Sequence, residues 1–236
     1  MIDFKDITIQ LGAFSLQHVT LHIPTGAYAV LMGRTGCGKT TLLEAACGLR
    51  PLTAGRIRLM GRDVTNLPPG QRGVGLVPQD GALFTTMSVA DHLGFALRVR
   101  KRPRKLIRDR VAELADWLGI TYLLKRRPQG LSGGERQRVA IGRAMAAHPD
   151  ILCLDEPFSA LDEETHADML DLLRRVHRET GVTVMHITHN RREARALANP
   201  LIVLRDGQVV ERDLDSIGAT PDPATDEVIE DNGDVN

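Results

Sequence analysis

Hydrophobic and polar residues alternate along the N-terminal part of the chain. Apolar side chains recur at about every second position in residues 7–11 and again in residues 16–23. A period of two is typical of strands in a half-exposed sheet, so an antiparallel pair is predicted at the start of the chain. Further short strands are expected around residues 56–60 and 73–77, because glycine and proline punctuate the turns between them.

Three continuous apolar runs, at residues 28–32, 151–154 and 182–187, are expected to form buried strands. Unbroken apolar runs are typical of parallel strands that are covered on both faces. Residues 41–49 favour a helix after the first run, and residues 163–179 are expected to form the crossover helix between the other two. This order of strands and helices predicts an α/β fold.

The two remaining segments have different patterns. Residues 88–147 are rich in leucine, arginine and alanine, with an apolar spacing near 3.6, so this stretch is predicted to be helical. Near the other end of the folded part, residues 201–204 and 208–211 are predicted to pair as a hairpin. The dipeptide at residues 206–207 is Asp-Gly, which favours a tight turn between them.

Charge is balanced over the whole chain but not along it. Thirty Lys and Arg residues equal thirty Asp and Glu residues, yet residues 211–236 contain nine acids and one base. The preceding residues therefore carry a net charge of +8, which suits an anionic ligand or surface. We expect one domain over residues 1–212, with a helical subdomain at about 88–147, and an acidic tail over residues 213–236.

Composition excludes several classes of protein. The chain is 42% hydrophobic and 25% charged, close to the average for globular domains, which argues against disordered and fibrous proteins. It lacks a continuous apolar span, so no transmembrane helix is expected. Asp3 and Asp6 stand where a secretory signal would need positive charge. Three scattered cysteines predict neither a disulfide framework nor a zinc site, and a reducing compartment is expected.

A phosphate-binding loop is predicted directly after the first buried run. The pattern G-x-x-x-x-G-K-[ST] is matched by Gly33, Arg34, Thr35, Gly36, Cys37, Gly38, Lys39 and Thr40. Glycines let successive amides turn toward phosphates, and the helix start adds its dipole. Lys39 is expected to place charge near the β and γ phosphates, and Thr40 to bind magnesium. The strand before the loop and the helix after it argue against a merely structural turn.

Two carboxylates end the second buried run. Asp155 is expected to reach a magnesium ion, because carboxyl ends of parallel strands deliver acids to such sites. Glu156, one residue further, could polarise an attacking water as a general base. An ordinary strand with a solvated acidic end is the alternative, and it is much weaker beside a phosphate loop.

A segment in the middle of the chain narrows the interpretation to one family. Residues 131–138, Leu-Ser-Gly-Gly-Glu-Arg-Gln-Arg, resemble the signature of ATP-binding-cassette (ABC) ATPases. Gln79, residues 159–162 and His189 fall where the Q-loop, D-loop and switch histidine of that family fall. The resemblance covers residues 1–212. It implies a P-loop NTPase core with a parallel sheet, an N-terminal antiparallel β subdomain and a helical subdomain that carries the signature.

The resemblance also implies a role for each matching residue. ATP would be sandwiched between two copies of the chain, the signature of one copy covering the γ-phosphate held by the other. The residues implied in catalysis are Glu156, His189, Gln79 and Lys39. Those implied in binding magnesium are Thr40, Gln79 and Asp155. Those implied in binding ATP are Phe14, Gly33, Arg34, Thr35, Gly36, Cys37, Gly38, Lys39, Thr40, Thr41, Ser132, Gly133, Gly134 and Asp162.

Three positions need separate comment. Phe14 lies near the adenine-stacking aromatic of the family, but a plain core phenylalanine fits its position equally well. His186 and His189 are three residues apart on a strand and so face opposite ways, which argues against a zinc pair and places His186 in the core. Relatives often carry aspartate where this chain has Asn190, which removes one charge beside the switch histidine.

Residues 98–110 contain eight bases and one acid. A solvated loop and helix face is the simplest interpretation. Contact with anionic lipid headgroups is a second interpretation, since each base near such a surface contributes about 1 kcal/mol. Nucleic acid is disfavoured, because no aromatic side chains are interleaved to stack on bases.

Residues 67–84 look most like importer subunits of the molybdate, sulfate, sugar and polyamine group. The resemblance implies a peripheral ATPase on the cytoplasmic side of the cell membrane, bound to transmembrane permease subunits and served indirectly by a substrate-binding protein. An oxyanion such as molybdate, tungstate or sulfate is the implied cargo. The alternative is a soluble ABC ATPase that acts on nucleic acid or ribosomes.

Overall fold

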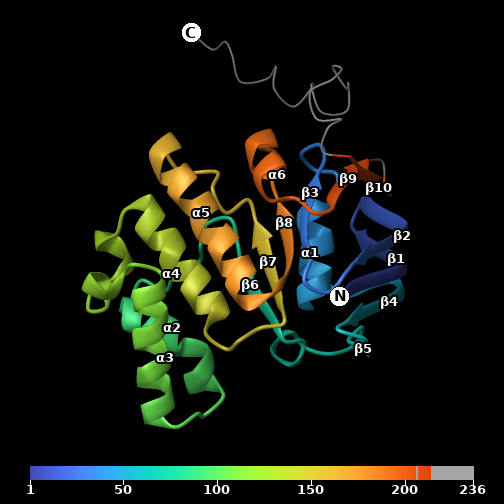
Figure 1. Ribbon diagram of the computed structural model, residues 1–236. Helices are drawn as coiled ribbons and strands as arrows, with labels where there is room; N and C mark the ends of the chain where they lie inside the picture. The colour runs from blue at the N-terminus through green and yellow to red at the C-terminus, as the bar shows by residue number, and fades with distance from the viewer. Residues whose placement is uncertain (206, 214–236) are drawn as a thin grey trace.

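The computed structural model describes residues 1–205 and 207–213 and contains two sheets joined through one helix (Figure 1). The predicted acidic tail lies outside the described residues, except for Asp213, and so does Asp206 of the predicted turn. No helix in the described part of the chain combines the length and the apolarity needed to cross a membrane.

The smaller sheet is antiparallel and has the strand order β2-β1-β4-β5. Its strands are β1 (Ile2–Leu11), β2 (Phe14–Ile23), β4 (Ala54–Leu59) and β5 (Arg62–Asp63). The predicted antiparallel opening is confirmed, but β1 begins earlier than the alternation at residues 7–11 indicated. Ile2 and Phe4 extend it, because they pair with Ile23 and Leu21 and are fully buried.

The larger sheet has the order β10-β9-β3-β8-β7-β6, and all its neighbours pair in parallel except β9 and β10. Its strands are β3 (Tyr28–Met32), β6 (Val74–Val77), β7 (Ile151–Asp155), β8 (Thr183–Ile187), β9 (Leu201–Arg205) and β10 (Gln208–Arg212). The predicted buried parallel strands and the C-terminal hairpin are confirmed. The two strands expected near residues 56–60 and 73–77 belong to different sheets.

Five helices cover one face of the larger sheet and extend away from it as a helical arm (Figure 1). They are α2 (Val89–Val99), α3 (Arg104–Trp117), α4 (Gly133–Met145), α5 (Glu163–Thr180) and α6 (Arg191–Leu197). The predicted crossover helix is confirmed as α5. Within residues 88–147 the helix prediction holds for α2 to α4, whereas the connection from α3 to α4 contains two short 3₁₀ turns.

Helix α1 (Lys39–Cys47) covers the other face and is sandwiched between the two sheets. The period-two geometry of the central strands therefore divides the interior into two cores. In β7, Ile151 and Cys153 pack with α1, while Leu152 and Leu154 pack with the helices of the opposite face. Continuous apolar strands are required here because both faces are covered.

The basic run of residues 98–110 occupies the end of α2 and the start of α3. Arg98 pairs with Asp91, with 3.1 Å between Nη2 and Oδ1. Arg110 donates a 2.9 Å bond to the carbonyl of Met145 and so ties α3 to α4. Two of the eight bases thus stabilise the helical arm itself, whereas the bases between them are exposed.

Arg72 is a buried cation that joins α1 to the loop before β6. Its guanidinium donates bonds of 2.8 Å to the carbonyls of Ala45 and Leu67 and of 3.0 Å to that of Thr65. One of these acceptors, the carbonyl of Ala45 in the last turn of α1, also accepts from the amide of the C-cap residue Gly48 at 3.1 Å. Burial lowers the pKa of Arg72, but the group stays charged because its ordinary pKa is far above neutrality.

We expect Arg72→Ala to lower the free energy of unfolding by about 3 kcal/mol, because it removes three hydrogen bonds that a buried, charged donor makes between α1 and the loop. Urea unfolding monitored by circular dichroism measures this loss. Arg56→Ala is the matched control, since Arg56 is exposed on β4, and its effect should stay within about 0.5 kcal/mol. Equal stability of the two variants would show that the Arg72 bonds contribute nothing.

Candidate functional site

The predicted phosphate loop lies between β3 and α1, with Lys39 as the first helical residue. The Lys39 ammonium donates to the carbonyls of Gly33 and Arg34 at 2.8 and 2.9 Å. These two bonds tie the side chain of Lys39 to the first residues of the loop. Gly38 has φ 104°, and a Cβ there would stand 2.9 Å from the side chains of Phe14 and Leu16. This position therefore accepts only glycine, because β2 packs directly on the loop.

Asp155 ends β7 next to the first turn of α1. The Thr40 hydroxyl donates to Asp155 Oδ1 at 3.2 Å. Burial raises the pKa of Asp155, and the charge of Glu156 adds to that effect, while the bond from Thr40 and the charge of Lys39 oppose it. Hard oxygen donors placed together, one of them a carboxylate whose charge burial disfavours, fit a small divalent cation such as Mg²⁺.

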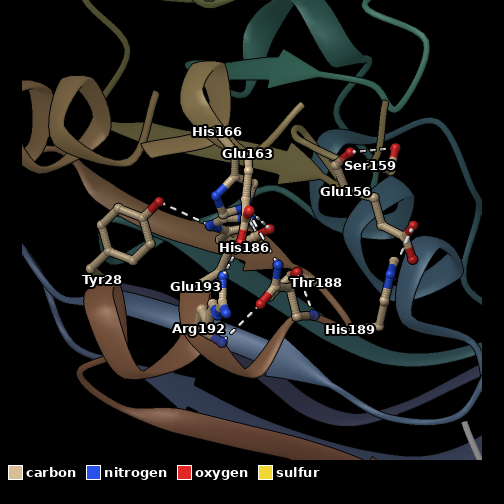
Figure 2. A network of polar contacts seen from close by, with 11 residues as sticks. Tyr28, Glu156, Ser159, Glu163, His166, His186, Thr188, His189, Arg192 and Glu193 are labelled. Atoms are coloured by element: carbon tan, nitrogen blue, oxygen red, sulfur yellow. Dashed lines mark hydrogen bonds and ion pairs between the residues drawn. The ribbon is translucent and has the colours of Figure 1, made fainter. Parts of the chain in front are cut away.

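Glu156 follows β7 and turns its carboxylate away from the strand. Its backbone has φ 43°, a left-handed conformation uncommon for a residue other than glycine. The amide of Glu156 donates to the carbonyl of Ile187 at 2.9 Å, and the Ser159 hydroxyl donates to the Glu156 carbonyl at 3.1 Å. These bonds hold the unusual backbone in place, and Figure 2 shows the carboxylate reaching toward His189.

Two further side chains approach the same carboxylate. Oε2 of Glu156 lies 3.5 Å from Nδ1 of His189, which follows β8, and 3.5 Å from Nε2 of Gln79, which follows β6. Three parallel strands that end at one edge of the sheet thus bring a carboxylate, an imidazole and an amide together. The side chains of Glu156 and His189 remain 24% and 54% exposed, so both can reach a ligand.

A cavity of about 620 Å³ joins these groups. Its lining residues are Leu11, Phe14, Thr35, Gly36, Gly38, Lys39, Thr40, Thr41, Gln79, Glu156 and His189. One end is apolar, formed by the hairpin of β1 and β2, and the other end holds the lysine and the acid. Leu11 was missed by sequence reasoning, although its pairing with Phe14 across the hairpin follows from the alternating pattern.

Cys37 also belongs to the loop, since its amide donates to the Arg34 carbonyl at 3.2 Å.

The signature segment starts α4, and Ser132 is the N-cap of this helix. The Ser132 hydroxyl accepts from the Glu135 amide at 3.2 Å, and the Ser132 amide donates to Glu135 Oε2 at 2.8 Å. This second bond, helped by one from Tyr122, lowers the pKa of Glu135. The Ser132 hydroxyl adds to the lowering, so the side chains of Ser132 and Glu135 hold each other at the start of the helix.

The two signature glycines allow close packing. A Cβ at Gly134 would lie 2.4 Å from Thr165 Cγ2, and one at Gly133 would lie 3.3 Å from Leu161. Asp162 caps α5 beside them and accepts from the Thr165 amide at 2.9 Å, which lowers the pKa of Asp162. The start of α4 therefore rests against the start of α5. The glycines are thus required for packing of α4 on α5, independently of any role in binding an anion.

Within one chain the signature does not join the cavity. Ser132, Gly133, Gly134 and Asp162 are not among its lining residues in the described part of the chain, whereas ten of the predicted site residues line it. The predicted site residues thus fall into two groups. One lies at the edge of the larger sheet, and the other at the start of α4 and α5.

Comparisons with known proteins identify relatives of this chain. The family profile described as ABC transporter matches residues 16–159. The molybdate/tungstate import ATP-binding protein WtpC of Thermococcus kodakarensis is 45% identical over 198 residues, which cover 84% of this chain and 60% of that protein. The sulfate/thiosulfate import ATP-binding protein CysA of Mycobacterium bovis is 42% identical over 205 residues, 86% of this chain and 58% of its own length. The chain thus spans about 60% of the curated relatives that it matches.

A solved structure supports the fold. The dimeric post-hydrolysis state of the ATP-binding cassette MJ0796, bound to ADP and Pi, superposes with a TM-score of 0.81 at 30% identity. The match covers 91% of this chain and 99% of that one. The expected fold, with its antiparallel sheet, parallel sheet and helical arm, is confirmed. With the profile match and these relatives, the phosphate loop, acidic strand end and capped signature helix show that the chain belongs to the ABC transporter family.

Proposed function

We propose that this chain binds ATP with Mg²⁺, hydrolyses it, and works as the nucleotide-binding subunit of a membrane importer. The observation that carries this proposal is the cavity in which Lys39, Glu156 and His189 face a common space beside an apolar wall. A triphosphate needs the cation and the loop amides, its hydrolysis needs the base, and an adenine needs the apolar wall.

The nucleotide would lie along the cavity. Residues 33–41 would cradle the phosphates with their backbone amides, and the N-terminus of α1 would add its dipole. Lys39 would exchange its two carbonyl partners for phosphate oxygens, which carry more charge. Phe14 would stack on the adenine, since it lines the same cavity and packs against the loop at Gly38.

Magnesium would be held by Thr40, Asp155 and Gln79. The metal supplies charge neutralisation at the β and γ phosphate oxygens. Thr40 and Asp155 already lie 3.2 Å apart, and the bound cation would remove the burial penalty on the Asp155 carboxylate. Gln79 would contribute its amide oxygen from the loop after β6, where its nitrogen lies near Glu156.

Hydrolysis would depend on Glu156 as the general base. Its carboxylate stands one residue beyond Asp155 and points away from the strand, so it could accept the proton of a water that attacks the γ-phosphate. His189 would orient this carboxylate and donate a hydrogen bond to the γ-phosphate. Lys39 would stabilise the charge that develops on the phosphoryl oxygens.

A second copy of the chain would complete the site. Ser132, Gly133 and Gly134 present a hydroxyl and helix N-terminal amides, which suit an anion, yet they lie outside the cavity of their own chain. A head-to-tail pair would place them over the γ-phosphate held by the partner, with Asp162 at the same interface. The dimeric assembly of the similar cassette MJ0796 with ADP and Pi supports this arrangement.

The transport role rests on the relatives. WtpC and CysA are named as import ATP-binding proteins for molybdate or tungstate and for sulfate or thiosulfate. We extend this role to the present chain, with permease subunits as partners, a substrate-binding protein as an indirect one, and the cytoplasmic face of the membrane as its place. A tetrahedral oxyanion is the proposed cargo, and nucleic acid is not a proposed partner.

We expect Glu156→Gln to hydrolyse ATP at least ~100-fold more slowly than the unmodified chain, a loss typical of a general base, while binding ATP with unchanged affinity. Release of phosphate and equilibrium binding of a fluorescent ATP analogue measure the two effects. Glu113→Gln, the same change at an exposed site on α3, is the control. Normal turnover by Glu156→Gln would exclude Glu156 as the base.

Chelation of divalent cations tests the role of the metal independently of the role of the general base. We expect excess EDTA to abolish hydrolysis by the unmodified chain and added Mg²⁺ to restore it, because the charge at the β and γ phosphates is then neutralised again. Asp155→Asn should need a higher Mg²⁺ concentration for half-maximal rate, as measured by titration. Hydrolysis that persists in EDTA would contradict the metal site.

In the Glu156→Gln background, ATP should drive dimer formation, because the bridge between two copies is then not removed by hydrolysis. Adding Ser132→Arg should abolish the dimer and spare ATP binding, whereas adding Lys39→Ala should abolish both. Sedimentation velocity with and without Mg-ATP measures the dimer. A dimer that survives Ser132→Arg would place the signature outside the interface.

Affinity purification of the full chain from its native cells tests the partner. A polytopic membrane protein should copurify, and molybdate or sulfate with its binding protein should stimulate hydrolysis by the complex in vesicles. Recovery of ribosomes or DNA in place of a permease would favour the alternative role.

A further inference from the structure

A buried carboxylate stands behind the switch histidine. Glu193, in the first turn of α6, is 4% exposed. Its Oε1 accepts a 2.8 Å bond from Nε2 of His166 on α5, and its Oε2 lies 3.2 Å from Nε2 of His186 on β8. Figure 2 shows the carboxylate between the two imidazoles. One acid on α6 therefore contacts two other elements, α5 and β8.

The hydrogen bonds set the role of His186. The hydroxyl of Tyr28 lies 2.9 Å from Nδ1 of His186, and both residues are buried. Burial, with the charge of Glu193, raises the pKa of Tyr28 well above its usual value. The hydroxyl therefore stays protonated and donates a hydrogen bond to Nδ1. The proton of the neutral imidazole is then on Nε2 and faces Glu193. His186 is confirmed as a core residue, and it also orients the acid.

Glu193 remains ionised in this place. Burial by itself raises the pKa of Glu193, but the interactions with His186 and the hydrogen bonds from His166 and Thr188 outweigh burial and leave the pKa below its usual value. A buried carboxylate with several donors is firmly held, because losing one donor leaves a charge without compensation. The cluster therefore links α5, α6 and β8 through one buried charge.

The cluster continues into residues 188–190, the segment that carries the switch histidine. Thr188 follows β8 two residues after His186, and the Asn190 amide donates to the Thr188 hydroxyl at 3.0 Å. Asn190 Oδ1 accepts from the Arg192 amide at 2.8 Å, and its Nδ2 lies 3.4 Å from Nε2 of His166. Thr188 and Asn190, the two neighbours of His189, are thus bonded to each other beside the cluster, whereas the His189 side chain itself is half exposed and reaches Glu156. The direction of His189 follows from the position of residues 188 and 190.

The same cluster reaches the start of α5. His166 belongs to the first turns of this helix, and its amide donates to the carbonyl of the N-cap residue Asp162 at 2.8 Å. Phe158, in the segment between Glu156 and α5, packs edge-on against both His166 and His186. The segment after Glu156 and the segment after β8 are therefore fixed to one another behind the cavity.

We propose that Glu193 is a positioning residue for hydrolysis, which it serves by clamping His166 of α5 and His186 of β8 so that His189, which follows β8, stays directed at Glu156. This inference rests on the proposed ATPase function. Glu193 does not touch the cavity that would hold the nucleotide. Its effect is confined to the orientation of His189, so it acts on the rate of the chemical step and leaves the binding of ATP unchanged.

Replacing either partner of the bond between His166 and Glu193 tests the clamp. We expect Glu193→Gln and His166→Ala to lower kcat at least ~10-fold with KM for ATP changed by less than about 2-fold, because a misplacement of about 1 Å at a reacting group is enough for such a loss. His166→Gln should recover most of kcat, since its amide can still donate to Glu193. Steady-state phosphate release over a range of ATP concentrations separates kcat from KM.

The chain provides a matched control. Arg192 and Glu163 form an ion pair of 2.7 Å between the same two helices, but both side chains are more than three-quarters exposed. Arg192→Ala should leave kcat unchanged. Wild-type kcat in both clamp variants would overturn the proposal. So would an equal loss in His166→Ala, His166→Gln and Arg192→Ala, because general loosening of α5 against α6 would then explain the effect.

Hydrogen exchange tests the clamp independently of hydrolysis. In Glu193→Gln, amides of residues 188–191 should exchange at least ~10-fold faster than in the unmodified chain, with β7 and α1 unaffected. Unchanged exchange in this segment would overturn the clamp even if the chain hydrolyses ATP. Faster exchange in a chain that does not hydrolyse ATP would support the clamp and reject the proposed function, so the two failures are distinguishable.

Discussion

The parallel strands of the larger sheet end at one edge, and the whole site depends on this alignment. β3 delivers the phosphate loop, β7 delivers Asp155 and Glu156, β6 leads to Gln79, and β8 leads to His189. In a parallel sheet all carboxyl ends point the same way, so residues far apart in the sequence meet without long loops. The two apolar cores that cover the sheet keep this edge aligned.

Close approach is the second constraint, and it explains several small residues. Gly38 lets β2 pack on the phosphate loop, and Gly134 lets the signature helix pack on α5. The left-handed backbone of Glu156 has a related effect, because it turns a side chain that would follow the strand into the cavity. A left-handed backbone at a residue other than glycine costs conformational energy and is stable only when neighbouring elements hold it.

The signature helix and the cavity belong to different parts of the chain. The capping box of Ser132 and Glu135 forms the helix start locally, within four residues, and needs no ligand. Its contact with α5 then orients this start relative to Asp162. Under the proposed function these are the two complementary halves of a phosphate site, and the helical arm that carries the second half lies away from the first (Figure 1).

Patterns along the sequence determined the strands, the crossover helix and the phosphate loop, because alternation, apolar runs and glycine spacing are local properties. Lys39, Asp155 and Glu156 could be predicted from their places after such runs, and the signature, Gln79 and His189 from family resemblance. Tertiary structure decided which sheet each short strand joins, the early start of β1, and the clamp of Glu193. These features depend on contacts such as those of Ile2 with Ile23 and of His166 with Glu193, which lie more than twenty residues apart in the sequence. A single side chain such as His166 carries no local signal of the partner that it meets in the folded chain.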